Sequence, residues 1–81
     1  MKRDNIIISL INLFEEYSSM DVFQAFSNIV NDSGRMSEIL KQIEELPQLQ
    51  LLTPQIRESF LRRAESLLKK QWLVINIRPK R

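Results

Sequence analysis

The chain has 81 residues and a mass of 9.6 kDa; 43% of its residues are hydrophobic, 27% are charged, and the formal net charge is +2 at pH 7. This length limits the chain to one domain, residues 1–81, with a single hydrophobic core. The absence of cysteine and histidine excludes disulfides, thiolate or imidazole metal sites and histidine-dependent nucleophiles, and one glycine is too few for a dinucleotide-binding or P-loop fingerprint.

Apolar residues at helical spacing predict two helices in the first part of the chain, over residues of about 5–17 and 19–31. Ser18 and Asp21 stand three residues apart between these segments. Their spacing resembles the capping box that starts many helices, with aspartate in place of the usual glutamate. The second helix is therefore expected to begin directly after Ser18.

A turn separates these helices from a third one. In residues 31–34, the first three side chains favour local hydrogen bonds, and the fourth residue, Gly34, tolerates a positive φ. The apolar stripe that follows predicts a helix over residues of about 35–46. Pro47 disfavours helical backbone at the residue before it, so the helix is expected to stop there.

The fourth helix has the clearest start signal in the chain. Thr53 is a good N-cap residue, and Pro54 suits the first helical position. A broad apolar face then predicts a helix over residues of about 54–71. The linker over residues 47–52 is short and apolar for a loop, so we expect it to lie across the helices rather than in water.

The last ten residues, 72–81, change character. Leu73, Ile75 and Ile77 would share one side of an extended chain, but Ile75 also continues the helical stripe that includes Trp72. Both an extended tail and a prolonged helix are compatible with this pattern. Four helices joined by short turns predict an all-α fold, a small four-helix bundle.

Apolar residues exceed what the core of such a bundle needs. Three isoleucines are consecutive at 6–8, and Val22 is followed by Phe23, so one residue of each group must point away from a simple bundle seam. The linker leucines and the apolar residues of the tail add to this excess. Exposed apolar patches of this kind predict contact surfaces.

Charge is divided along the chain. Residues 1–52 carry four basic and eight acidic residues, a net charge of −4, whereas residues 53–81 carry eight basic and two acidic residues, a net charge of +6. Three interpretations follow: the fourth helix complements its acidic neighbours within the molecule, the basic end meets an acidic patch of a partner, or it binds phosphate. The first is the default, because mixed charge is usual on helix surfaces.

Our first functional hypothesis is a non-enzymatic helical module that binds another protein, as an adaptor, regulator or inhibitor, and that self-associates as a homodimer. An extended tail could pair with its symmetry mate or add a strand to a partner's sheet. The expected partner-binding residues are an apolar set with a basic rim. They are Trp72, Leu73, Ile75 and Ile77, with Arg57, Arg63 and Lys70.

The alternative is a nucleic-acid-associated accessory protein that uses the basic C-terminal third of the chain. Arg57, Arg63 and Lys70 have no i,i+4 carboxylate partner, and three more basic residues follow them in the tail. The expected phosphate-binding residues are Arg57, Arg63, Lys70, Arg78, Lys80 and Arg81.

The sequence offers few residues suited to catalysis. Glu15 and Glu16 are adjacent, as are Glu44 and Glu45, and neighbours on a helix point in different directions, so neither pair forms a convergent acid–base dyad. We therefore expect no enzymatic activity, no metal, no cofactor and no small-molecule substrate. The lack of cysteine and of a signal peptide or membrane span predicts a cytoplasmic protein.

Overall fold

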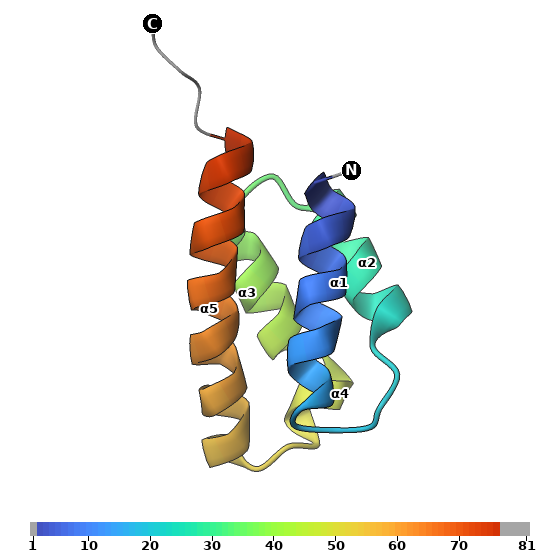
Figure 1. The fold of residues 1–81 in the computed structure, drawn as a ribbon. Helices are drawn as coiled ribbons and strands as arrows, with labels where there is room; N and C mark the ends of the chain where they lie inside the picture. Colours follow the sequence, from blue (N-terminus) through green and yellow to red (C-terminus); the bar gives the residue numbers. More distant parts are fainter. Residues whose placement is uncertain (1, 77–81) are drawn as a thin grey trace, which may run out of the picture.

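The structure, a computed structural model, describes the backbone of residues 2–76 and the side chains of residues 3–71. The predicted all-α bundle is confirmed, and the described residues contain no strand (Figure 1). Four long helices match the four expected ones, and a single turn of helix lies in the linker. The helices are α1 (Lys2–Glu15), α2 (Phe23–Asp32), α3 (Met36–Glu44), α4 (Pro47–Gln50) and α5 (Pro54–Asn76).

Helix α1 lies between α2 and α5, and α3 packs against both α5 and α2 (Figure 1). The side chains that are completely buried come from every helix, so one core joins all five elements. They include Ile6, Leu10, Phe14, Phe26, Val30, Ile39, Ile43, Leu49, Phe60 and Leu68.

Three phenylalanine rings form the centre of this core. Phe60 on α5 stands edge-on to Phe14 on α1, with ring centroids 5.2 Å apart, and stacks with Phe26 on α2 at 6.2 Å. Phe14 and Phe26 also meet edge-on at 5.7 Å. Edge-to-face pairs stabilise by about 0.5–1.5 kcal/mol beyond the burial of their area. The cluster therefore joins α1 and α2, from the first half of the chain, to α5, from the second half.

Helix α2 begins later than the capping-box pattern predicted. The Ser18 hydroxyl accepts a hydrogen bond from the Met20 backbone N–H at 3.1 Å, and the Asp21 carboxylate accepts one from the Phe23 N–H at 3.0 Å. Each side chain thus serves the backbone two residues ahead, an arrangement that competes with a helical turn. Residues 19–22 form a connection instead, and the helix starts at Phe23.

The linker over residues 47–52 was expected to lie across the helices, and part of it does. Pro47 is the first residue of the single turn α4, and Leu49 from this turn is completely buried beneath the bundle. Leu51 nevertheless points into water, with 75% of its surface exposed. The predicted cap of the next helix is confirmed, because the Thr53 hydroxyl accepts a hydrogen bond from the Ile56 N–H at 3.2 Å.

For the first five residues after Gln71, the structure decides between an extended tail and a prolonged helix. The backbone of residues 72–76 continues α5, so the extended alternative is wrong for these five residues. A helix pairs its backbone groups internally, whereas a lone strand would leave them without partners. Residues 77–81 lie outside the described part of the chain.

Gly34 does not have the positive φ that its place in the turn suggested, and a Cβ built on it would meet no atom within 4 Å. We therefore expect Gly34→Ala to raise the free energy of unfolding by about 0.4–1 kcal/mol, because alanine restricts the unfolded chain more than glycine does. Chemical denaturation of both proteins measures the change. A loss of stability would mean that the turn needs glycine after all.

Candidate interaction surface

The predicted basic residues of α5 occupy different environments. Arg57 is half-buried and its Nη1 donates a hydrogen bond to the Leu49 carbonyl oxygen at 3.4 Å, so it holds α4 against α5. Lys70 is exposed. Trp72, Leu73 and Ile75 belong to the α5 backbone, and their side chains lie outside the described residues. The positions of the last predicted residues, Ile77, Arg78, Lys80 and Arg81, also lie outside them.

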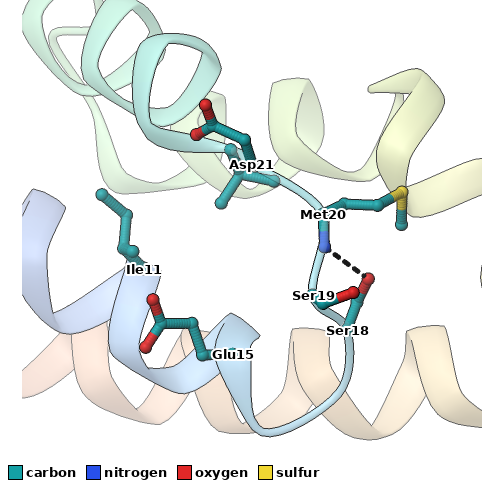
Figure 2. A pocket seen from close by; sticks show the side chains of 7 residues that line it. Ile11, Glu15, Ser18, Ser19, Met20 and Asp21 are labelled. Carbon is teal, nitrogen blue, oxygen red and sulfur yellow. Dashed lines mark hydrogen bonds between the residues drawn. The ribbon is translucent and has the colours of Figure 1, made fainter.

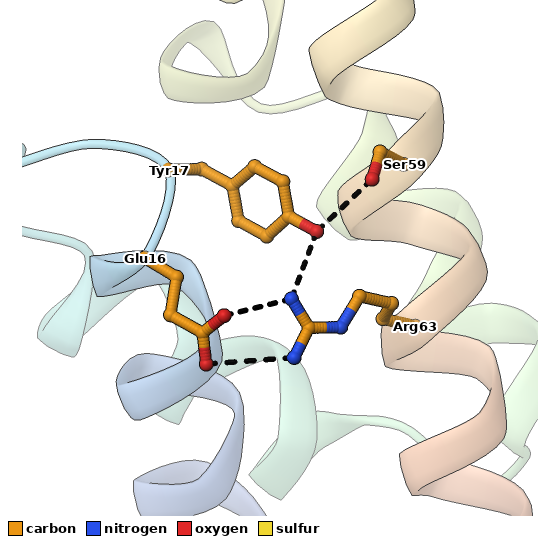
Figure 3. Close-up of polar contacts among 4 residues, drawn as sticks. All are labelled: Glu16, Tyr17, Ser59 and Arg63. Carbon is orange, nitrogen blue, oxygen red and sulfur yellow. Dashed lines mark hydrogen bonds and ion pairs between the residues drawn. The ribbon is translucent and has the colours of Figure 1, made fainter.

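Arg63 joins α5 to the end of α1 (Figure 3). Its guanidinium nitrogens lie 2.7 Å and 3.5 Å from the two Glu16 carboxylate oxygens, and Nη1 donates a second bond to the Tyr17 hydroxyl at 3.1 Å. The Tyr17 hydroxyl also shares a hydrogen bond with the Ser59 hydroxyl at 3.0 Å. The hydrogen bonds to Glu16 and Tyr17 raise the pKa of Arg63 above its usual range. This basic residue therefore already has an acidic partner within the molecule.

The same cluster lowers the pKa of the Tyr17 phenol, through its hydrogen bond with Ser59 first and that with Arg63 second. Because Tyr17 is the single tyrosine of the chain, the ultraviolet absorbance of tyrosinate reports its ionisation alone. We expect it to titrate below the ordinary value of about 10, and Ser59→Ala to raise its pKa.

The sign of the effect on stability follows from this lowered pKa. Ionisation of Tyr17 is easier in the folded chain, so the stabilisation is present above the ordinary value and disappears as pH falls through the folded pKa. Stability at neutral pH is therefore unaffected. An ordinary Tyr17 titration that Ser59→Ala leaves unchanged would contradict this account.

A shallow basic hollow lies between α1 and α5. It has a volume of about 560 Å³, and Leu13 and Leu67 form its apolar part, with Arg62, Arg63 and Lys70 around them. Arg62 is paired with Glu58 four residues earlier on the same helix, at 3.2 Å between Nη2 and Oε2. Two of the three basic side chains of this hollow are thus engaged by carboxylates of the same chain.

A second surface, between α1 and α2, has an apolar floor. Ile8 and Phe23 keep 53% and 55% of their surface exposed, and they line one hollow of about 330 Å³ with Ile7 and Ser27. These two are the outward-facing members of the apolar groups at 6–8 and 22–23 that the sequence singled out. Asp4 lines the same hollow.

A second hollow, of about 490 Å³, lies further along α1 (Figure 2). Ile11 and Glu15 line it from α1, and Met20 and Asp21 line it from the connection to α2. Ile8 and Ile11 are three residues apart on α1 and so share a face, which makes the two hollows consecutive. We call them together the α1–α2 groove.

The α1–α2 groove is acidic as well as apolar. Asp4 lies near one end of it, and Glu15 and Asp21 lie on opposite sides of the other end (Figure 2). Among the described residues that line it, none is basic. The sequence predicted an interaction surface on α5 and the tail, not at this groove. The feature of the sequence that points to the groove is the excess of apolar residues at 6–8 and 22–23.

The described residues contain no group of three acidic side chains placed to hold a metal ion. None of their helices combines the length and apolar character that crossing a bilayer requires. Comparison of the chain with protein-family models, with curated proteins and with solved structures gives no match.

Proposed function

We propose that this protein is a small non-enzymatic interaction module whose α1–α2 groove binds a protein segment. The observation that carries the proposal is the pair of exposed apolar side chains, Ile8 and Phe23, that line one hollow between two helices. An amphipathic segment laid into a groove between helices is a recurrent mode of protein recognition. Burial of exposed apolar surface supplies its free energy.

The test is affinity capture from the native host with three baits, each with and without nuclease. The baits are the unchanged chain, the double variant Ile8→Ser/Phe23→Ser, and Leu51→Ser as a control. Leu51 is an exposed apolar residue outside the groove, so its variant loses apolar surface without touching the site. We expect a nuclease-resistant protein that the first and third baits retain and the second loses. Equal retention by all three would contradict the proposal.

The second candidate function is nucleic-acid binding by the basic hollow between α1 and α5. It is favoured by the gathering of Arg62, Arg63 and Lys70 around one surface. It requires Arg63 to exchange Glu16 for a phosphate, since the two side chains are paired in the structure. Duplex affinity that falls steeply with salt and is removed by neutralising Arg62, Arg63 and Lys70 would support this function.

A further inference from the structure

One segment of the same chain, residues 73–81, complements the α1–α2 groove in its apolar residues and in its charge. Ile8 and Phe23 make one end of the groove apolar, and Glu15 and Asp21 at the other end are both exposed. The segment 73–81 has the opposite character at its end: four apolar residues, Leu73, Val74, Ile75 and Ile77, lead into the basic residues Arg78, Lys80 and Arg81, with no acidic residue among them. Apolar and charged complementarity together favour contact between the two.

The register of α5 against α1 restricts where this segment can bind. Gln71 donates to the Ser9 hydroxyl at 3.1 Å, and Arg63 pairs with Glu16, so the two helices run in opposite directions. The end of α5 is therefore at the same end of the bundle as Asp4 (Figure 1). Glu15 lies at the other end of the groove, about 16 Å further along α1 at 1.5 Å per residue.

Residues 73–76 cannot reach the groove of their own chain. Residues 73–76 are part of α5, which packs on the side of α1 that carries Ser9 and Glu16, whereas the groove lies on the side that carries Ile8 and Ile11. Helix α1, about 10 Å wide, separates them. Residues 73–76 can therefore reach such a groove only on another molecule.

We infer that the α1–α2 groove binds the segment 73–81 of a second copy of this chain, its apolar residues on Ile8 and Phe23 and its basic residues beside Glu15 and Asp21. This inference rests on the proposed function and names the partner as a second copy. Its ion pairs lie at an exposed rim, so added salt weakens the association.

The test is sedimentation equilibrium of the whole chain over a range of concentrations. The expected result is a mass that rises from one chain to two. Glu15→Lys and the double variant Arg78→Glu/Lys80→Glu should each weaken association by about tenfold or more, because each places like charges together. Combining all three changes should restore much of the loss, since the charges are then exchanged between the two surfaces.

Two comparisons separate the groove from general effects of charge and folding. Glu45→Lys makes the same charge change on an exposed residue after α3, away from the groove, and should leave association unchanged. Ile8→Ser/Phe23→Ser should abolish association while the helical circular dichroism of the monomer is retained, because both residues are largely exposed.

A chain that stays monomeric at every concentration overturns the inference, as does a dimer that Ile8→Ser/Phe23→Ser leaves intact. A failure to restore association in the combined charge variant also overturns it. The inference can fail without the proposed function: a monomeric chain that still captures a groove-dependent protein would contradict the second copy as partner and leave the interaction module standing.

Discussion

Phe60→Ala is expected to lower the free energy of unfolding by about 3–5 kcal/mol. The Phe60 ring is completely buried and contacts the rings of Phe14, Tyr17 and Phe26, with centroids between 5.2 and 6.2 Å away. Alanine would leave a cavity at the point where α1, α2 and α5 meet, and neighbours in a packed core collapse only partly into such a space. Domains are stable by about 5–15 kcal/mol, so this one change removes a large part of the total.

Phe23→Ala is the matched control, because it removes the same atoms from a ring that is 55% exposed. Its expected effect on the monomer is within about 0.5 kcal/mol, as for other surface changes. Urea denaturation followed by circular dichroism measures both variants, at a concentration where the chain is monomeric. Similar losses for the two variants would contradict the placement of Phe60 at the centre of the core.

This contrast between two phenylalanines shows how far the sequence determines the fold. Periodicity predicted the helices that carry Phe14, Phe26 and Phe60, and it indicated that one of Val22 and Phe23 must point outward. It could not decide which, because that choice depends on where α2 begins. The start depends on the Asp21 carboxylate, which binds the Phe23 N–H and not a later one.

The candidate surface was harder to predict than the fold. The partner of Arg63 is Glu16, which lies 47 positions earlier in the chain, and no local pattern relates the two. The sequence therefore indicated no carboxylate partner for Arg63, whereas in the structure it forms an ion pair with Glu16. The Arg63–Glu16 pair is one contact of the kind that the intramolecular interpretation of the charge division predicted.

The α1–α2 groove likewise depends on contacts between elements. Ile8, Ile11 and Glu15 share a face of α1 by their spacing, but the face becomes a groove through the placement of Met20, Asp21 and Phe23 beside it. Residues 19–22 were expected to be helical, and as a helix they would not form this connection. An error of one helical turn in a boundary was thus sufficient to hide the surface.

Leu49→Ala is the other change with a large expected effect, a loss of about 2–5 kcal/mol in the free energy of unfolding. Leu49 is completely buried although it belongs to a helix of four residues, which is too short to be stable on its own. Its side chain and the hydrogen bond between Arg57 and the Leu49 carbonyl hold α4 in place. Removal of the side chain should loosen the turn that leads into α5.

Leu51→Ala makes the same substitution two residues later, where the side chain is 75% exposed, and should change the free energy of unfolding by less than about 0.5 kcal/mol. Hydrogen exchange gives a second reading: the Leu52 N–H, which donates to the Leu49 carbonyl oxygen at 3.1 Å, should exchange faster in Leu49→Ala and unchanged in Leu51→Ala. If both leucines proved equally dispensable, α4 would be an ordinary surface loop. The difference between them is expected because residues two apart on a helical turn point to different sides, so that Leu49 faces the core while Leu51 faces water.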